Sequence, residues 1–335
     1  MLTGRFPDPV SIRLARGGTA SFPLAFAERE EARACAGIIK DAGDDPDVTH
    51  GALIIAEAAW AAPGSGIGFA AGEGVGTVTR IGLSLAVGEP AINPAPRRMI
   101  ADAIAEIADA SARAPDAEVE ISIPGGEALA AKTLNARLGI VGGLSILGTT
   151  GVVVPYSCSA WIASIHSGID VARAAGLTHI VGSTGANSES AAQKLYGLPE
   201  IALIDMGDFV GGMLKYLRRH PVPRLTIVGG VAKMTKLAQG LADLHSKRGE
   251  VDLATLAKFA TAAGAGERIR QGVLTANTAA QAFAIARAAG IALGDQVARA
   301  AQETAANIVA GTDIAIEVVL FDRDQNLVGR APFKV

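Results

Sequence analysis

Four carboxylates and one imidazole fall within eleven residues of a sequence that is otherwise apolar and nearly neutral. The stretch reads DAGDDPDVTHG, and its polar side chains are Asp41, Asp44, Asp45, Asp47, Thr49 and His50. Their spacing does not fit a calcium loop, which needs alternating ligands, a central glycine and a distal glutamate. Asp, Pro and Thr also form turns and caps by accepting hydrogen bonds from local backbone N–H groups. Two interpretations stay open: a solvated turn, or carboxylates that converge on a cationic or hydroxyl-rich ligand.

A pair of lysines follows an apolar run that ends at Gly229-Gly230. An amphipathic helix is expected to begin there, and its apolar face comprises Val231, Met234, Leu237, Leu241 and Leu244. Lys233 and Lys236 lie three residues apart, on neighbouring faces of the first turns. Positive charge at a helix N-terminus opposes the macrodipole unless an anion binds there, which favours an anion-binding role. His245 and Arg248 would extend this basic surface from the far end, although a histidine there is equally often an ordinary helix terminus.

Two more stretches place polar groups beside glycine or proline turns. In THIVGSTGANSES an expected strand runs into Gly182-Ser-Thr-Gly185, and Asn187 follows at a predicted helix start. Small ligands bind at this edge of parallel sheets, although a Ser/Asn-capped helix would have the same pattern. In GEPAINPAP, Glu89 and Asn93 stand between prolines in a stiff loop, which either lines a cleft or only leads into the next helix.

Several common chemistries lack their motifs. The sequence holds no Gly-x-x-x-x-Gly-Lys-Ser/Thr loop, no His-Glu-x-x-His, no Cys-x-x-Cys and no Gly-x-Ser-x-Gly. The run Gly72-Glu-Gly74-Val-Gly76 has the wrong spacing for a dinucleotide fingerprint and does not open a helix. We therefore expect no metal ligated by the protein, no phosphate-loop ATP hydrolysis and no esterase chemistry.

The composition indicates a two-domain globular protein. The 335 residues are half apolar, and a net charge of −3 leaves no electrostatic footprint for nucleic acid or an anionic membrane. The two distant cysteines and a start without signal-peptide character favour a cytoplasmic location. Between Arg137 and Asp170 no residue carries a formal charge, yet glycine pairs and Pro155 interrupt this stretch. We interpret it as buried interior or a lined cleft rather than a membrane span.

The rhythm of apolar residues predicts two kinds of domain. Residues 1–148 alternate mainly as strands and turns, among them a hairpin in VSIRL…TASFPLAF, with one clear helix over PRRMIADAIAEIADASARA. This pattern predicts an α+β domain. Residues 149–335 alternate strands with helices, which is typical of an α/β domain with a parallel sheet and crossover helices. Helices are expected at 252–263, 275–289 and 293–310, and a strand pair closes the chain; that pair either stays here or returns to the first domain.

Several long stretches resemble one known family. IIKDAGDDPDVTHGA, GEGVGTVTR, AVGEPAINPAPRRMI, EISIPGGEALAAKTLNARLGIVGGLSILGTTG and GIDVARAAG are similar to the cobalt-precorrin-5B C(1)-methyltransferases, the CbiD family of cobalamin biosynthesis. The resemblance is dense from about residue 30 to 250. It implies methyl transfer from S-adenosylmethionine to ring carbon 1 of a corrin precursor, and a Rossmann-like second domain.

The chain departs from the family pattern at four places. Members usually begin with a Thr-Thr-Gly-x-Cys-Ala segment, and this sequence starts after it. VVVPYSCSAW replaces a stretch that is commonly more acidic. Gly207-Asp-Phe-Val-Gly211 stands where an Asn-Phe-Val-Gly motif is usual. The family's Gly-x-x-Gly-Lys-x-x-Lys pattern keeps both lysines here, but its glycines are shifted to Gly229-Gly230.

The resemblance implies a site for two small molecules. A polycarboxylate tetrapyrrole requires basic and polar partners, for which the candidates are Lys233, Lys236, His245, Arg248, Glu89 and Asn93. The methyl donor's candidates are Asp41, Asp44, Asp45, Asp47, Thr49, Gly182, Gly185 and Asn187. Alternatively, the acidic loop braces a cleft through Lys40 and His50. Cobalt, if present, belongs to the substrate. Two other functions stay open: a non-enzymatic tetrapyrrole carrier and, from fold analogy alone, a nucleotide-dependent oxidoreductase.

Overall fold

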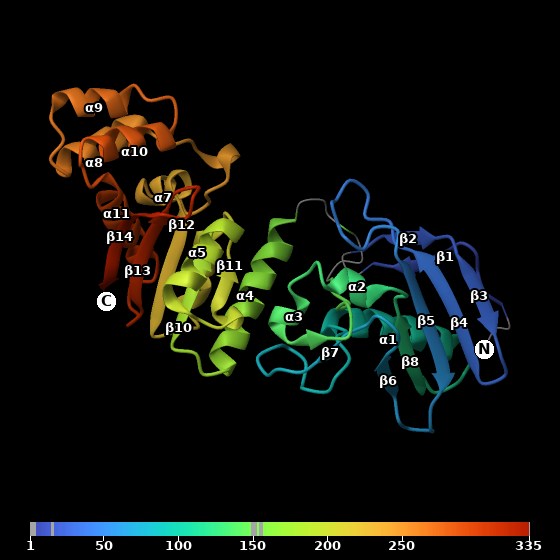
Figure 1. Cartoon of the computed structure of the whole chain (residues 1–335). Helices are drawn as coiled ribbons and strands as arrows, with labels where there is room; N and C mark the ends of the chain where they lie inside the picture. The colour runs from blue at the N-terminus through green and yellow to red at the C-terminus, as the bar shows by residue number, and fades with distance from the viewer. Residues whose placement is uncertain (1–4, 15–16, 149–152, 154–156, 335) are drawn as a thin grey trace. The chain divides into compact units, whose positions relative to one another are not determined.

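The structure is a computed structural model that describes residues 5–14, 17–148, 153 and 157–334 (Figure 1). The chain divides into two compact units, residues 1–157 and 158–335. The sequence rhythm alone places this boundary at 148/149. Both units combine helices with a mixed sheet, and each sheet has its own hydrophobic core.

The first unit is built on a five-stranded sheet of order β3-β4-β5-β8-β6. Its strands are β3 (Phe26–Arg29), β4 (Arg33–Ile39), β5 (Leu53–Trp60), β8 (Ala117–Ser122) and β6 (Ile67–Ala71). Neighbours are antiparallel except β6 and β8, which run parallel. The predicted first hairpin is confirmed, since β1 (Val10–Arg13) pairs antiparallel with β2 (Thr19–Phe22).

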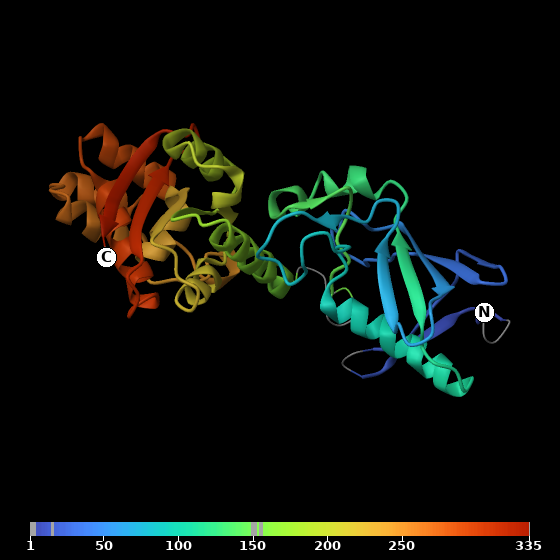
Figure 2. The same ribbon diagram turned by 90° about the horizontal axis from the view of Figure 1, so that it is seen from below.

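A long helix covers one face of this sheet. Helix α1 (Pro94–Ala110) lies along the sheet (Figure 2), and it begins with prolines, whose missing N–H groups cost nothing in a first helical turn. Its Ile100 and Ile104 pack against Val119 and Ile121, which alternate along β8 with outward-facing glutamates. Period-two alternation on the strand and helical spacing on α1 therefore meet in one core.

The glycine-rich motifs of the first unit are places where backbones cross. They lie around β7 (Thr77–Val78), β9 (Ile140–Val141), α2 (Gly126–Ala130) and α3 (Asn135–Leu138). A Cβ at Gly143 would lie 2.2 Å from the carbonyl carbon of Gly74, and one at Gly126 would lie 2.4 Å from the Gly74 oxygen. Since no side chain fits there, these glycines are explained by packing.

The second unit has a five-stranded sheet of order β11-β10-β12-β13-β14. Its strands are β10 (His179–Ser183), β11 (Leu203–Asp205), β12 (Arg224–Gly230), β13 (Ala315–Phe321) and β14 (Leu327–Lys334). The first four in the order are parallel, whereas β14 is antiparallel to β13. The alternative in which the last strands return to the first domain is wrong, because β13 pairs with β12 along its whole length.

Helices cover both faces of the second sheet. The larger core packs under α4 (Cys158–Ala174), α6 (Val210–Leu217), α7 (Val231–Ala238), α8 (Leu253–Ala262), α9 (Glu267–Leu274), α10 (Ala279–Ala288) and α11 (Leu293–Ile308). Helix α5 (Ala186–Tyr196) covers the opposite face, and η1 (Glu200–Ala202) and η2 (Ser246–Arg248) are short 3₁₀ turns. In the described part of the chain, no helix is both long and apolar enough to cross a membrane.

Two helices differ from the sequence prediction. Helix α9 was not predicted, because its apolar face is short and consists of Ile269, Val273 and Leu274. Helix α7 ends at Ala238, so Leu241 and Leu244 lie beyond it in a turn where Gly240 adopts φ +90°. Leu244 is nevertheless buried, which explains why its spacing looked helical.

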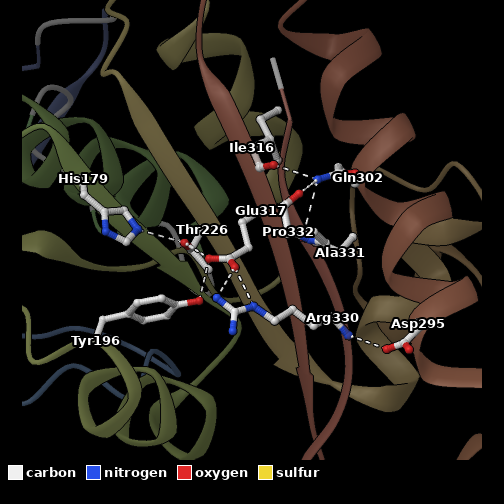
Figure 3. Close-up of polar contacts among 10 residues, drawn as sticks. All are labelled: His179, Tyr196, Thr226, Asp295, Gln302, Ile316, Glu317, Arg330, Ala331 and Pro332. Carbon is white, nitrogen blue, oxygen red and sulfur yellow. Dashed lines mark hydrogen bonds and ion pairs between the residues drawn. The ribbon is translucent and has the colours of Figure 1, made fainter. Parts of the chain in front are cut away.

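A buried polar network ties the strands of the second sheet together (Figure 3). The Glu317 carboxylate is fully buried; it accepts hydrogen bonds from Tyr196 Oη (2.5 Å) and Thr226 Oγ1 (2.9 Å) and pairs with Arg330 (2.7 Å). His179 Nε2 lies 2.8 Å from Thr226 Oγ1. Because the Thr226 hydroxyl gives its one hydrogen to Glu317, the Nε2–H of His179 is the donor in this contact.

Candidate functional site

The strand order of the second sheet reverses beside β10, and a cavity lies at that point. The chain leaves β10 through α5 to β11 on one side, then crosses back through α6 to β12 on the other. The loops after β10 and β12 therefore diverge, and such switch points are where open parallel sheets bind ligands. A cavity of about 970 Å³ lies there, between the loops that follow β10, β12 and β13.

The cavity has an apolar wall and a polar rim. Its apolar lining includes Phe283, Ile291, Leu293, Leu327 and Val328, and its polar lining includes Asn187, Lys233, Thr278, Arg287, Arg323 and Asn326. These residues come from α5, α7, α10 and the start of α11, from the turns that precede α10 and α11, and from the turn between β13 and β14 together with the first residues of β14. A pocket of this size, largely apolar with a few convergent polar groups, is suited to a small organic ligand.

Two helices open onto the cavity without side-chain caps. Gly185 precedes α5 and Gly230 precedes α7, and within the described ranges no side chain caps either helix. By contrast, Thr278 caps α10 by accepting a hydrogen bond from the N–H of Gln281 at 3.1 Å. The first N–H groups of α5 and α7 are therefore available to a ligand, and together with the helix dipoles they favour an anionic group.

Lys233 joins the two sides of the switch point. Its Nζ donates to the backbone oxygen of Thr184, after β10, at 2.7 Å, and lies 3.1 Å from Asp208 Oδ1, after β11. Both contacts position the ammonium at the cavity rim. An ammonium has three N–H donors, so one remains for a ligand beside these two contacts.

Asn187 connects α5 to the turn between β13 and β14. Its Nδ2 donates to the backbone oxygen of Arg323 at 3.2 Å, and its Oδ1 accepts from Gln325 Nε2 at 2.9 Å. Burial raises the pKa of Asp322 in this turn, but hydrogen bonds from Asn326 and Asp324 outweigh it, so the pKa lies below its ordinary value. The turn is therefore an ordered wall of the cavity.

Two predicted residues lie in the second unit but away from the cavity. Gly182 is inside β10, where a Cβ would lie 2.6 Å from the Met213 methyl carbon, so a packing requirement explains it. Lys236 is 8% exposed, and its Nζ donates to the backbone oxygen of Leu244 at 3.0 Å. Its charge holds the turn after α7 and does not line the cavity.

The predicted basic extension is also separate from the cavity. His245 Nδ1 accepts a hydrogen bond from the Lys247 N–H at 3.2 Å and caps η2. Arg248 is exposed and pairs with Asp243 at 3.5 Å. Neither side chain lines the cavity. Because α7 is shorter than predicted, these residues do not continue its surface.

The acidic loop belongs to the first unit, where it closes the hairpin between β4 and β5. Asp47 pairs with Lys40 at 2.5 Å and accepts hydrogen bonds from the N–H and hydroxyl of Thr49. Burial raises the pKa of Asp47, but these contacts outweigh it and the pKa is lowered. Asp41 Oδ1 accepts from the Gly43 N–H at 2.8 Å and lies 3.8 Å from His50 Nδ1. These polar side chains therefore bond to other groups of the same turn.

The proline-flanked loop is held by a single arginine. Glu89 pairs with Arg97 Nη2 at 2.7 Å, and Arg97 also donates to the backbone oxygens of Ile92 and Pro90. Asn93 precedes α1, and its backbone N–H donates to Ile146 O at 3.0 Å. These contacts make the loop the ordered entrance to the helix.

The sequence prediction missed most of the cavity. Phe283, Arg287 and Arg323 line it, but nothing in their local pattern distinguishes them from ordinary helix and turn residues. The turn Asp322–Asn326 gave one usable signal, since a polar turn at the carboxyl end of a parallel strand is a common ligand position. Among the described residues, no cluster of three His, Cys, Asp or Glu side chains could hold a metal ion.

Comparison with known proteins identifies the family. The family description CbiD matches residues 1–155, and the description CbiD, C-terminal domain matches residues 243–332. A curated cobalt-precorrin-5B C(1)-methyltransferase from Bradyrhizobium sp. is 62% identical over 98% of this chain and 88% of its own length. The chain belongs to the CbiD family. A protein of the same name from Halorhodospira halophila is 59% identical over 99% of this chain and 89% of its own length.

A solved structure is also similar to this CbiD chain. The cobalamin biosynthesis protein (cbiD) from Archaeoglobus fulgidus is 26% identical, over 71% of this chain and 73% of that chain, with a TM-score of 0.35. On the present structure, the CbiD-like motifs GEGVG and IPGGE form the backbone crossing of the first unit. GIDVARAAG runs from the last turns of α4 into the turn after it. These motifs therefore identify the family through its fold rather than through the cavity.

Proposed function

We propose that this chain is a methyltransferase that transfers the methyl group of S-adenosylmethionine to ring carbon 1 of cobalt-precorrin-5B, a step in building the corrin ring of cobalamin. Membership of the CbiD family and the shared name of its relatives support the reaction. One structural observation supports the location of the donor site. A cavity lies at the switch point of the second sheet, and two helices begin at it without side-chain caps.

We infer that the second unit is a Rossmann-like cofactor-binding fold. Its four parallel strands, the reversal of their order beside β10 and the helices on both faces support this assignment. The glycine fingerprint of dinucleotide-binding proteins serves a pyrophosphate. S-adenosylmethionine has no phosphate, so the lack of that fingerprint agrees with this donor.

The residues at the cavity fit the chemistry of the donor. Its α-carboxylate would be held by the N–H groups that begin α5 and α7. Its adenine would pack on the apolar wall of Phe283, Ile291 and Val328. A cavity of about 970 Å³ has room for a ligand of this size.

The donor is already activated, so the protein's task is alignment. The ring carbon supplies an electron pair to the methyl carbon, while the sulfur keeps the pair of the broken S–C bond and becomes a neutral thioether. Such an in-line displacement gains most from fixed distance and angle between the two reactants. The hydrogen bonds of Lys233 on α7 and Asn187 on α5 with the turns around the cavity supply that rigidity.

The substrate's carboxylate fringe requires cations near the donor. Lys233, Arg287 and Arg323 lie on the cavity rim. Arg287 pairs with Asp322 at 3.6 Å and is 71% exposed, while Arg323 makes no ion pair with another described residue. We assign these three side chains to substrate carboxylates. The acidic loop would repel such a fringe, and its internal pairing with Lys40 supports a structural role for it.

The donor site is tested by filling it. Ala284 is an exposed residue of α10 that lines the cavity, and Ala262 is an exposed alanine of α8 that does not. In the full chain, Ala284→Trp should weaken S-adenosylmethionine binding in calorimetry by at least about ten-fold, because the indole occupies the ligand volume. Ala262→Trp and Asp44→Asn should leave that affinity unchanged.

Four results would contradict parts of this proposal. Equal donor affinity in Ala284→Trp and the wild type would show that the donor does not bind in the cavity. A lower donor affinity in Asp44→Asn would place the donor at the acidic loop instead. Tight binding of NAD instead of S-adenosylmethionine would favour an oxidoreductase. Single-turnover reactions separate an enzyme from a carrier, because a carrier binds the tetrapyrrole but leaves it unmethylated.

A further inference from the structure

An exposed tryptophan stands at the carboxyl end of β11. Trp161 lies in the first turn of α4, and 45% of its surface is exposed. Its Nε1–H donates to the backbone oxygen of Asp205, the last residue of β11, at 3.2 Å. The one polar atom of the indole is therefore already bonded, so the surface that faces water is a flat apolar ring.

The indole is also held in one orientation by the loop beneath it. Gly207 adopts φ +53°, and a Cβ on this residue would lie 3.2 Å from Trp161 Cζ2. The Phe209 ring lies 6.5 Å from the indole at an angle of 52°. The glycine leaves room for the ring, while the hydrogen bond and the aromatic contact fix it. A ligand that stacks there does not have to order the side chain first.

A short run of contacts connects Trp161 to the donor cavity. Gly207 lies against the indole, the next residue is Asp208, and Asp208 pairs with Lys233 at 3.1 Å. Lys233 lines the cavity and donates to Thr184 O. Strands β11 and β12 are separated by β10 alone in the sheet order, so their carboxyl ends are roughly 10 Å apart. A ring broad enough to cover that distance touches both.

We propose that Trp161 is the platform on which the tetrapyrrole ring of the substrate stacks, beside the methyl-donor cavity. This assignment rests on the proposed function, and it adds where the acceptor lies. The conjugated face of the macrocycle covers the indole. Lys233, between platform and cavity, binds a carboxylate of the ring's fringe with its remaining N–H donor. Trp161 is thereby a substrate-positioning residue.

The test compares the chain's two tryptophans, Trp60 and Trp161. Binding of cobalt-precorrin-5B is measured in the full chain without methyl donor. Trp161→Ala should weaken it by about ten-fold or more, the loss of one aromatic stack and its buried area, and Trp161→Phe by less. Trp60 is also exposed, at 37%, and lies on β5 in the first unit. Trp60→Ala should leave substrate affinity unchanged.

Each outcome separates this inference from the proposed function. In Trp161→Ala, S-adenosylmethionine affinity should stay within two-fold of the wild type, which also shows that the fold is intact. Unchanged substrate affinity in Trp161→Ala would show that the ring does not stack on Trp161. An equal loss of substrate affinity in Trp60→Ala would contradict the stacking as well. If the wild type binds neither the donor nor cobalt-precorrin-5B, the proposed function fails instead.

Fluorescence supplies a second readout that does not depend on affinity. Trp60→Phe leaves Trp161 as the single tryptophan of the chain. Addition of cobalt-precorrin-5B should quench its emission strongly and protect it from acrylamide, because the ring covers the exposed indole face. Quenching by the substrate with unchanged access of acrylamide would mean that the ring binds nearby but not on Trp161, and would overturn the stacking.

Discussion

Gly185 and Gly230 begin two helices at the same cavity, but only Gly185 has a backbone conformation that requires glycine. Gly185 adopts φ +152° and ψ +168°, a region that other residues rarely enter. Gly230 adopts φ −72° and ψ +155°, which any residue tolerates. A Cβ would meet nothing within 4 Å at either position. A comparison of the two glycines therefore measures backbone strain without a contribution from steric crowding.

Substitution by alanine should distinguish these two glycines in the ligand-free protein. Gly185→Ala should lower the free energy of unfolding by about 1–3 kcal/mol, the typical cost of such a strained conformation. Gly230→Ala should change it by less than about 0.5 kcal/mol. Urea unfolding followed by circular dichroism measures both. Equal stability of the two variants would show that the turn after β10 relaxes to another conformation.

The pairing of β13 with β14 has a buried charge at its centre. The side chain of Glu317 is fully buried, whereas that of its partner Arg330 is 43% exposed. Tyr196 and Thr226 satisfy the second carboxylate oxygen, so the network connects α5, β12, β13 and β14 (Figure 3). Burial and the Glu317 contact raise the pKa of the Tyr196 phenol, which keeps it a hydrogen-bond donor. The two partners of the ion pair should therefore differ in how much their removal costs.

Loss of the arginine should be more damaging than neutralisation of the glutamate. Arg330→Met leaves an unpaired buried carboxylate, which costs about 3–5 kcal/mol, while Glu317→Gln leaves a guanidinium that water can reach and should cost about 2 kcal/mol. The double variant should be more stable than the sum of the two predicts. Additive losses in urea unfolding would mean that the pair makes no coupled contribution.

At the scale of the whole molecule, the two units differ in their histidines. Burial lowers the pKa of His166 and of His179, and both lie in the second unit. In the unfolded chain a histidine has a pKa near 6.5. Below that pH these histidines bind more protons in the unfolded state than in the folded one, so the second unit loses stability as the pH falls through this range. Above about pH 7 the imidazoles are neutral in both states, and the stability no longer depends on them.

The acid sensitivity of the second unit can be measured by itself. Each unit holds one tryptophan, so Trp60→Phe makes Trp161 the reporter of the second unit. Its urea midpoint should be lower at pH 5.5 than at pH 7.5. Substituting both histidines, His166→Gln and His179→Gln, should reduce that difference. A midpoint that is the same at both pH values would contradict the burial of neutral imidazoles.

The fold was largely predictable because its signals are local. Alternation along β8, the helical spacing of α1 and the strand–helix rhythm after residue 168 arise from neighbours in the chain. The end of α7 was not predictable from the sequence. Leu244 is buried by tertiary packing, so its spacing matched that of a longer helix. The sequence left two interpretations of the acidic loop open because it shows only charge density, whereas the contacts of Asp47 with Lys40 and Thr49 appear only in three dimensions.

By itself the sequence determined the family and the alternation of elements, since motif glycines and apolar periods are properties of adjacent residues. Only the tertiary structure decided which polar groups share a site. The cavity collects four segments, around residues 184–188, 230–233, 278–294 and 321–328, that are far apart along the chain. Strand order brings their ends together, and strand order depends on which hydrophobic faces pack best across the whole unit. Hence Lys233 reached the cavity, while Lys236, three residues later, turned into the interior.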